Sequence, residues 1–525
     1  MPPDSPTVAE VLRGHVRARG NHRLLVCDAE RISYADADRR SAQLARGLIA
    51  LGAGKGTHVG LLYPNGVDFV VAMLAAARIG AVVVPFSTFA TGPEMQRQLD
   101  HSDVEILFAA PSYRSHDYAK RLAGVIGDCD LDSGERLFSG VVPQLRHVAL
   151  SQERICRFGA NVDEALLSAM EDDVDGSDSL AIVYTSGSTG APKGVVHTNA
   201  ALLSHQRNLN EIRGLTTEDK LFCNSPFFWI GGFAFGLLAT LVAGSTLVCS
   251  TAVDAGETLD LLEAERPTIA NGFAAGVAAL ARHPSFGRRD LSSMRRGNLY
   301  PIMAPDARPA DPELRHNMLG LTEAGSVVLL SGDETDQPEH RRGSFGKPAP
   351  GFETKIVDPD TGVTATAGSS GDRAGELCIR GPYVMRSYYR RAREECFDVD
   401  GWFHTGDLVR ADTDGFFYFI GRLDAMIRSA GANVAPAEVE RAIARVTGGT
   451  VSYVVGVPDP ERGQAVAAVV VSDHGVDGCA LDHLLRSELS AYKIPKRFVA
   501  LSASDVPLMS SGKVDLRRLK QVFDA

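Results

Sequence analysis

The stretch YTSGSTGAPKG at residues 184–194 constrains this chain more than any other part of its sequence. It combines three glycines, four serine or threonine hydroxyls and one lysine, and it directly follows the apolar run LAIV. Glycines let backbone N–H groups turn towards an anion, hydroxyls add donors, and a lysine adds a positive charge. The stretch therefore predicts a phosphate-binding loop that follows a buried strand.

Two common phosphate loops do not match this stretch. A Walker A loop requires Gly-Lys followed by serine or threonine, whereas no Gly-Lys pair of this chain is; Gly512-Lys513, for example, is followed by valine. The dinucleotide pattern G-x-G-x-x-G is also absent from the stretch. A solvated Ser/Gly hairpin is the remaining alternative, and the apolar run before the loop argues against it.

Composition narrows the class of protein. A chain of 525 residues with 44% apolar and 23% charged residues predicts a globular protein with more than one domain. Its net charge of -11 argues against a nucleic-acid or anionic-membrane partner. Eight cysteines without a C-x-x-C pair indicate neither a zinc ribbon nor a redox dithiol. The N-terminus has no long apolar stretch of a secretory signal, so we expect a cytoplasmic protein.

One uncharged segment, residues 227–248, is long enough to span a bilayer. It contains four glycines and begins with a loop-like stretch, PFFWIGG, that starts one residue earlier. We therefore expect a buried helix followed by a strand, and no membrane span.

The order of apolar segments predicts an α/β fold. In the first half, THVGLLY, DFVVAMLAAARIGA and VVVPF read as strand, buried helix and strand, and the same rhythm returns from residue 220. From residue 343 onward, FETKIVD, GELCIRG and GFFYFIG indicate a small β-rich subdomain. The last hundred or so residues read as a compact α+β module, with a boundary near residues 422–425.

Four further stretches follow the loop: GLTE (320–323), GWFHTGDL (401–408), GRLDAMIRSAGANVAPAEVE (421–440) and PLMSSGKVDLRRL (507–519). With the loop, they make nearly the whole chain resemble the adenylate-forming superfamily of acyl-CoA synthetases, luciferases and peptide-synthetase adenylation domains. The resemblance implies that a carboxylate attacks ATP, with Mg²⁺, to give acyl-AMP and pyrophosphate, and that coenzyme A then takes the acyl group. It also implies an N-terminal domain (1–421), a hinge (422–425) and a mobile C-terminal domain (426–525).

The resemblance implies a set of ATP-binding residues. The loop residues that would hold the β- and γ-phosphates are Thr185, Ser186, Gly187, Ser188, Thr189, Gly190 and Lys193. Thr322 would contact the α-phosphate and Glu323 would help to place magnesium, although a Thr-Glu pair is common in any sequence. Asp407 would accept hydrogen bonds from the ribose hydroxyls, unless it only caps its own turn.

Further roles fall near and beyond the predicted hinge. Arg422 would add a cation near the ribose or phosphates, and Asp424 would mark the hinge, although a plain N-cap is nearly as credible. Lys513 would contact the carboxylate and the α-phosphate during adenylation, although a lysine in such a turn is ordinarily solvated. Ala430 and Gly431 would border the coenzyme A tunnel, where glycine lets a pantetheine arm pass close to the backbone.

The acyl site is expected around two stretches. Trp229 and Gly231 lie in SPFFWIGG, where relatives often carry a histidine in place of the tryptophan, and a core aromatic is the alternative for Trp229. Phe273, Ala275 and Gly276 lie in NGFAAGVAAL and would line a roomy apolar pocket. Between 225 and 235 there is no carboxylate for a substrate ammonium, so we expect an acid without an α-amino group.

One segment departs from the family pattern. Residues 296–319 are several positions shorter than in relatives, which carry a Gly-Gly-x-Pro type turn against adenine. MAPDA (303–307) could replace that turn, and Leu319 replaces the usual aromatic. We therefore expect a remodelled adenine wall.

Three functions remain open from the sequence. We expect an acyl-CoA synthetase acting on a medium- or long-chain fatty acid or a bulky ring-bearing acid. A ligase that passes acyl-AMP to a carrier protein is the nearest alternative within the enzymes. A non-catalytic nucleotide or acyl-adenylate binding protein is the alternative from another class, and the joint presence of Lys193, Glu323, Asp407, Arg422 and Lys513 argues against it.

Overall fold

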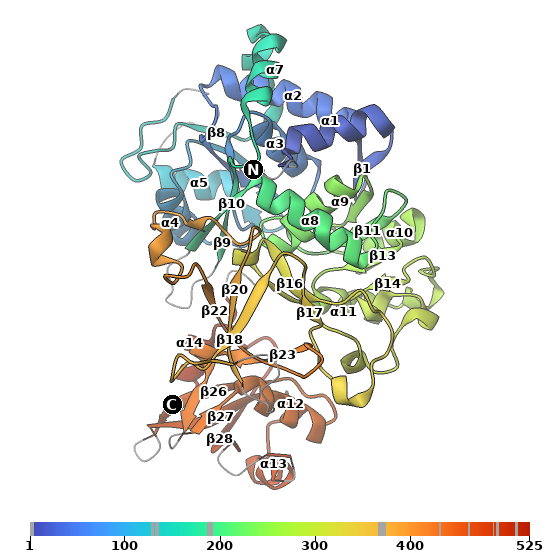
Figure 1. The fold of residues 1–525 in the computed structure, drawn as a ribbon, viewed down its shortest axis with the longest axis vertical. Coiled ribbons are helices and arrows are strands. Elements are labelled where there is room, and N and C mark those ends of the chain that lie inside the picture. The colour runs from blue at the N-terminus through green and yellow to red at the C-terminus, as the bar shows by residue number, and fades with distance from the viewer. Residues whose placement is uncertain are drawn as a thin grey trace. The chain divides into compact units, whose positions relative to one another are not determined.

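A computed structural model describes residues 5–127, 131, 136–185, 193–365, 374–429, 432–459, 463–486, 488–489, 493–509 and 513–524. The chain forms two compact units (Figure 1). Unit 1 comprises Met1–Glu353 and Arg380–Gly401, and unit 2 comprises Thr354–Ile379 and Trp402–Ala525.

Unit 1 contains a seven-stranded sheet that carries the predicted phosphate loop. In spatial order its strands are β21 (Ser387–Tyr388), β10 (Lys193–Thr198), β9 (Ser179–Thr185), β4 (Val82–Pro85), β3 (His58–Leu62), β5 (Ile106–Ala109) and β8 (His147–Ala149). From β9 to β8 the strands are parallel, whereas β10 and β21 add an antiparallel edge. The apolar run LAIV is buried within β9, so the predicted strand before the loop is confirmed.

A second, six-stranded sheet completes the α/β part of unit 1. Its strands in spatial order are β14 (Arg296–Gly297), β13 (Ile269–Asn271), β11 (Lys220–Cys223), β12 (Thr246–Cys249), β1 (Arg23–Cys27) and β2 (Glu30–Ser33). The first five are parallel and β2 runs antiparallel to β1. Ligand sites in such sheets form beyond the carboxyl ends of the strands.

Helices pack around both sheets (Figure 1). They are α1 (Val8–Arg19), α2 (Tyr34–Ala50), α3 (Val67–Arg78), α4 (Gly92–Ser102), α5 (Tyr118–Ile126), α6 (Gln152–Phe158), α7 (Glu164–Asp173), α8 (Asn199–Arg213), α9 (Ala239–Ala243), α10 (Ala255–Glu265) and α11 (Ala278–Arg282). Helix α3 is buried on nearly every face, because its side chains share one hydrophobic core with strands of both sheets. The predicted buried helix is thereby confirmed.

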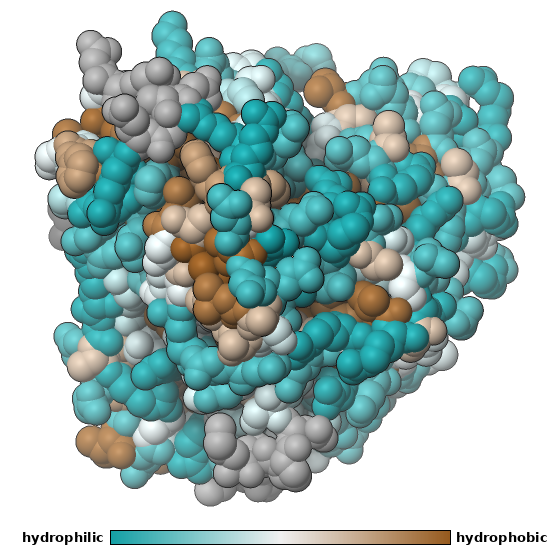
Figure 2. Space-filling view, turned by 90° about the horizontal axis from the view of Figure 1, so that it is seen from above, coloured by the Kyte–Doolittle hydropathy of each residue, from teal (hydrophilic) through white to brown (hydrophobic). Residues whose placement is uncertain are grey.

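The uncharged segment 227–248 folds inside unit 1. It forms a buried π-helix (Gly231–Leu238), then α9 and the buried strand β12, as the sequence predicts. A Cβ on Gly232 would lie 2.1 Å from the carbonyl oxygen of Pro226, so the start of this helix requires glycine. Among the described helices, none is long and apolar enough to cross a bilayer. One face of the molecule is largely hydrophilic, with apolar side chains exposed in small patches (Figure 2).

A small antiparallel sheet carries the GLTE stretch. It consists of β15 (Leu319–Leu321), β16 (Ser326–Leu330) and β17 (Lys347–Pro348). In the shortened segment before it, the chain forms three short 3-10 turns, at Tyr300–Ile302, Pro305–Ala307 and Pro312–Leu314. The MAPDA stretch contains the second of these turns.

Unit 2 begins with an antiparallel sheet, which confirms the predicted β-rich subdomain. Its strands in spatial order are β19 (Thr364–Ala365), β18 (Glu353–Val357), β20 (Gly375–Arg380), β22 (Phe403–Ala411) and β23 (Phe417–Arg422). The long pair of β22 and β23 brings the HTGDL and GRLD stretches side by side.

The rest of unit 2 is an α+β module, as predicted. Its sheet contains β25 (Ala432–Val434), β24 (Ile427–Ser429), β27 (Gly463–Val471), β26 (Ser452–Asp459) and β28 (Arg497–Leu501). Its helices are α12 (Pro436–Val446), α13 (Gly478–Leu485) and α14 (Leu516–Gln521). Helices α12 and α13 share one core with the sheet, and α14 contributes to a second.

Candidate active site

The phosphate loop connects two strands of a hairpin in unit 1. Thr185 ends β9, Lys193 begins β10, and the two residues are paired across the hairpin. Predicted loop residues Ser186, Gly187, Ser188, Thr189 and Gly190 lie outside the described residues. The structure thus brings the first and last residues of the predicted phosphate set to one end of the sheet.

A tyrosine links this lysine to the predicted magnesium residue. The Lys193 ammonium lies 5.2 Å from the centre of the Tyr388 ring, and the Tyr388 hydroxyl donates a 2.6 Å hydrogen bond to the Glu323 carboxylate. Tyr388 reaches both because β21 pairs with β10, which places it beside Val195. Burial raises the pKa of Tyr388, and the negative charge of Glu323 raises it further, so the phenol keeps its proton.

The Thr-Glu pair is held by its backbone. Thr322 and Glu323 form a 3-10 turn between β15 and β16. The His197 Nε2–H donates a 2.7 Å hydrogen bond to the Thr322 carbonyl, and the Met385 N–H donates one of 2.7 Å to the Glu323 carbonyl. Burial lowers the pKa of His197 to about 4, so this imidazole is neutral at pH 7. These contacts fix the turn and direct the Glu323 side chain to Tyr388.

The charges of this cluster are not paired with each other. Lys193 faces a neutral ring and the Glu323 carboxylate accepts from a neutral hydroxyl, and no ion pair of either is found among the described residues. A cation and a carboxylate in this state can bind a phosphate and a divalent cation. The sequence analysis did not predict a role for Tyr388. The sequence feature that marks this residue is the tandem tyrosine pair 388–389.

Two of the predicted acyl-site residues, Phe273 and Gly276, lie against Asn224 in unit 1. The rings of Trp229 and Phe273 lie edge to face with centres 6.1 Å apart. Asn224 holds the backbone of Phe273 on both sides, accepting from its N–H at 2.7 Å and donating to its carbonyl at 2.9 Å. A Cβ on Gly276 would lie 2.7 Å from Asn224 Nδ2, so any larger residue there would displace the Asn224 amide. Gly231 opens the π-helix two residues after Trp229.

Asn224 was also missed by sequence reasoning. Its signal is its place directly after the strand β11, at the carboxyl end of a parallel sheet. The side chain of Ala275, which completes the predicted set, lies outside the described part of the structure.

In unit 2 the predicted ribose and phosphate residues form an ion pair. Asp407 and Arg422 are cross-strand partners on β22 and β23. Arg422 Nη1 lies 2.8 Å from the Asp407 carboxylate and donates a 2.9 Å hydrogen bond to the Thr405 carbonyl. The Asp407 side chain is 7% exposed and that of Arg422 is 47% exposed. The structure thus brings these two predicted residues together on the last two strands of the sheet.

A bulge in β22 presents Asp407. Glu376 pairs with Leu408 and Cys378 with His404, so the three residues 376–378 of β20 oppose the five residues 404–408 of β22. The Glu376 carboxylate accepts from the Gly406 N–H at 2.9 Å, which closes the bulge from inside. Bulges of this kind redirect side chains and are frequent beside active sites. Glu376 was missed because its stretch, GELCIRG, reads as a plain strand.

Three further predictions concern the end of the chain. Asp424 lies in a 3-10 turn, Leu423–Ala425, and its side chain is not described. Ala430 and Gly431 lie outside the described residues. Lys513 is exposed, and its carbonyl accepts a 2.7 Å hydrogen bond from the Met509 N–H. The predicted turn at Lys513 is consistent with this contact.

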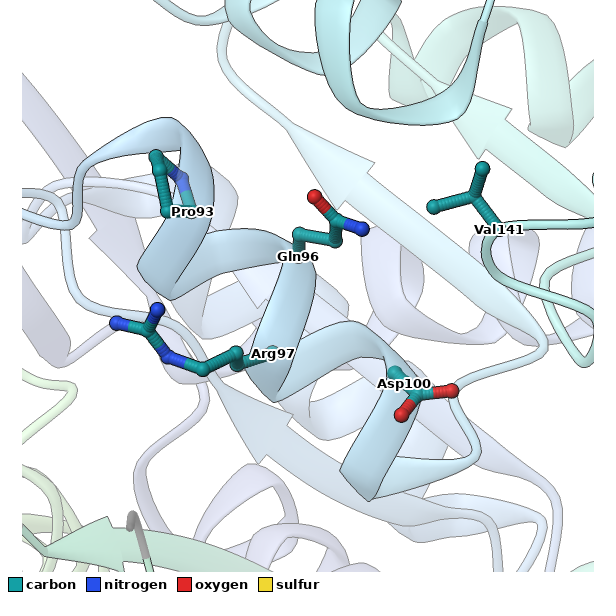
Figure 3. Close-up of a pocket in the computed structure, with 5 residues that line it drawn as sticks. All are labelled: Pro93, Gln96, Arg97, Asp100 and Val141. Atoms are coloured by element: carbon teal, nitrogen blue, oxygen red, sulfur yellow. The ribbon is translucent and has the colours of Figure 1, made fainter. Parts of the chain in front are cut away.

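A separate hollow lies along α4. It measures about 320 Å³ and is lined by Pro93, Gln96, Arg97, Asp100 and Val141 (Figure 3). None of the predicted site residues lines it.

Comparison with known proteins assigns the class. Residues 12–389 match the family model described as AMP-binding enzyme, and residues 438–513 match the AMP-binding enzyme C-terminal domain. A feruloyl-CoA synthase of Amycolatopsis sp is 32% identical over 92% of this chain and 92% of its own length. A long-chain-fatty-acid–CoA ligase of Mycobacterium tuberculosis is 30% identical over 94% of each chain. The crystal structure of an anthranilate CoA ligase in complex with anthranoyl-AMP has a TM-score of 0.80 at 22% identity, covering 98% and 97% of the two chains.

The chain belongs to the AMP-binding enzyme family, the adenylate-forming superfamily that its motifs resemble. Within that family it is an acyl-CoA synthetase, an AMP-forming acid–thiol ligase.

Proposed function

We propose that the chain couples a carboxylic acid without an α-amino group to coenzyme A in two steps. The carboxylate oxygen attacks the α-phosphorus of ATP and pyrophosphate leaves; the thiol of coenzyme A then attacks the acyl carbon and AMP leaves. The observation that carries the proposal is the cluster of Lys193, Tyr388 and Glu323, whose cation and carboxylate form no ion pair with any residue that the structure describes. The first step brings two anions together and needs such groups to offset their charge.

The residues of unit 1 would act on the phosphates. Thr185 and Lys193 flank the loop and would bind the β- and γ-phosphates together with residues 186–190. Glu323 offers an oxygen ligand of the kind that Mg²⁺ prefers, and Thr322 beside it would contact the α-phosphate. Bound Mg²⁺ would neutralise part of the phosphate charge during attack.

The residues of unit 2 would act on the ribose and on the reacting groups. The Asp407 carboxylate would accept from the ribose hydroxyls, with Arg422 supporting it. Lys513 would offset the charge of the carboxylate and the α-phosphate in the first step. Residues 422–425 would serve as the hinge, with Asp424 in it, and Ala430 and Gly431 would border the path of coenzyme A.

For the acid we propose a medium- or long-chain fatty acid or a bulky apolar ring-bearing acid. The contact of Trp229 with Phe273 and the buried π-helix after Trp229 support an apolar site. The names of two relatives, a feruloyl-CoA synthase and a long-chain-fatty-acid–CoA ligase, also point to apolar acids, one aromatic and one aliphatic.

Mass spectrometry of the products tests the proposal. The chain is incubated with ATP, Mg²⁺ and acids from acetate to long-chain and ring-bearing, with and without coenzyme A. We expect acyl-CoA and AMP from an apolar acid class. Acyl-AMP without thioester would instead indicate a carrier-protein acceptor, and no product with any acid would favour a non-catalytic binding protein.

A lysine variant ties the product to the proposed site. Lys513→Ala should reduce exchange of labelled pyrophosphate into ATP by about 10²–10³-fold, because one cationic contact to the developing charge is lost. Lys520→Ala, which removes an exposed lysine from the nearby α14, is the matched control and should exchange at the normal rate. Normal exchange by Lys513→Ala would refute its role.

A further inference from the structure

Three side chains with metal-binding atoms converge in unit 2. Glu376, Cys378 and His404 each offer one ligand atom, and these atoms all lie within 4.8 Å of one another. Residues two apart on a strand share a face, and Cys378 pairs directly with His404 across the sheet. The backbone of β20 and β22 therefore builds this cluster, independently of the phosphate site in unit 1.

Two of the three separations between the ligand atoms can be compared directly with those of a zinc site. The Cys378 Sγ lies 3.4 Å from the His404 Nδ1, and this nitrogen lies 2.7 Å from a Glu376 oxygen. Around tetrahedral zinc, bonds of about 2.3 Å to sulfur and 2.1 Å to nitrogen or oxygen place sulfur and nitrogen about 3.6 Å apart, and nitrogen and oxygen about 3.4 Å apart. The sulfur–nitrogen pair already matches. The nitrogen–oxygen separation has to lengthen by about 0.7 Å, which requires the Glu376 carboxylate to rotate away from His404.

We propose that Glu376, Cys378 and His404 form a binding site for zinc, with water as the fourth ligand. Thiolate and imidazole are the ligands that favour zinc over magnesium or calcium. The cysteine is fully buried and the glutamate side chain is 11% exposed, whereas the histidine side chain is 43% exposed. The metal would therefore enter beside the imidazole, and its open position would face water.

Zinc binding releases one proton from the protein. The Cys378 thiol releases its proton to solvent, and the imidazole proton moves from Nδ1 to Nε2, so that Nδ1 can bind the metal. The second Glu376 oxygen keeps its hydrogen bond from the Gly406 N–H. The metal would thus join β20 to β22 at the base of the bulge that presents Asp407, and would hold that bulge in place.

Cobalt absorption tests the site on the full-length chain. The protein is stripped of metal with a chelator and titrated with Co²⁺, which gives a sulfur-to-metal charge-transfer band only when a thiolate is a ligand. We expect one cobalt per chain, a charge-transfer band, and loss of the band when Zn²⁺ is added. Cys378→Ser should lose the band completely.

Two further variants make the outcome decisive. His404→Ala removes a partly exposed ligand, so we expect this variant to fold. It should weaken Co²⁺ binding at least about tenfold. Cys479→Ser removes an exposed thiol from α13 and should keep the band unchanged. The site is refuted if the chain gives no charge-transfer band, if the band survives both ligand variants, or if it depends on Cys479.

Discussion

The two clusters of predicted site residues treat charge in opposite ways. In unit 1, Lys193 lies over a neutral ring and Glu323 accepts from a neutral hydroxyl. In unit 2, Asp407 and Arg422 already neutralise each other at 2.8 Å. Uncompensated charges suit ligands that are themselves charged, such as triphosphate and Mg²⁺, whereas a paired carboxylate suits neutral hydroxyl donors such as those of ribose.

The histidines beside the two clusters also differ, both in their burial and in the groups that they contact. His197, below the Thr322 turn, is completely buried and neutral, and His205 on α8 is buried in the same manner, donating to the Val327 carbonyl at 2.9 Å. His404 in unit 2 is partly exposed and lies 2.7 Å from a carboxylate. The contrast teaches that unit 1 holds its turn with neutral buried groups, and we therefore expect unit 1 to lose stability in acid.

The largest expected effect is a loss of unit 1 stability in acid. Burial lowers the pKa of His197 to about 4 and that of His205 to about 3. Below the ordinary pKa of about 6.5 the unfolded chain takes up protons that the folded chain does not, so the free energy of unfolding falls as pH drops. Between pH 6.5 and pH 4 we expect a loss of about 3 kcal/mol from His197, and a loss of the same order from His205.

Urea unfolding at several pH values measures this loss. The chain has two tryptophans, Trp229 in unit 1 and Trp402 in unit 2, so the Trp402→Phe background leaves a fluorescence signal from unit 1 alone. In that background His205→Gln keeps an N–H donor and should flatten the pH dependence. His474→Asn, an exposed control, should leave it unchanged. A stability of unit 1 that is constant from pH 7 to pH 4 would contradict the assignment.

The next largest effect separates the two clusters by their response to magnesium. Glu323→Gln removes the charge that would bind Mg²⁺ and should reduce pyrophosphate exchange by about 10²–10³-fold, since it acts where charge develops. The Mg²⁺ concentration for half-maximal exchange should also rise. The exposed Glu339→Gln serves as the matched control. An unchanged magnesium requirement would exclude Glu323 as a ligand.

Asp407→Asn should act on ATP binding instead. Losing a charged hydrogen-bond acceptor costs about 1.5–3 kcal/mol, so we expect KM for ATP to rise by about tenfold or more while kcat changes little. Replacing ATP by its 2′-deoxy analogue should weaken binding to the unaltered chain and add little to the variant, because the same contact is already lost. Independent, additive losses would show that Asp407 does not bind the ribose hydroxyls.

Much of the architecture was readable from the sequence, for reasons that particular elements show. The apolar run 69–77 of α3 has one low-energy solution, burial in a core shared with strands of both sheets. The charge-free segment 227–248 has Gly232 where the π-helix needs a close backbone contact. Short apolar runs bounded by Gly and Asp turns also located the strands β18, β20 and β23 of unit 2. The motif residues Lys193 and Glu323, and likewise Asp407 and Arg422, were expected to belong together.

The residues that were missed all act through pairings distant in sequence. Glu376 lies 30 positions before Gly406, whose N–H donates a hydrogen bond to it, and Asn224 lies 49 positions before its partner Phe273. No local pattern in a single sequence reveals either contact, because the contact depends on how distant strands align with each other. The bulge in β22 likewise depends on how two strands align, and so the cluster of Glu376, Cys378 and His404 became visible only in three dimensions.

The smallest expected effect tests the link inside unit 1. Tyr388→Phe keeps the ring under the Lys193 ammonium and removes only the hydroxyl that donates to Glu323. We expect pyrophosphate exchange to fall by about tenfold, the cost of about one hydrogen bond to a charged group. Tyr389→Phe, which removes a hydroxyl that donates to Asp103, is the matched control. In the Glu323→Gln background the Tyr388→Phe effect should shrink, because the two side chains act as a pair. If the two losses of pyrophosphate exchange instead simply add, Tyr388 does not position the Glu323 carboxylate. The difference in charge pairing between the two units would then rest on Lys193 alone.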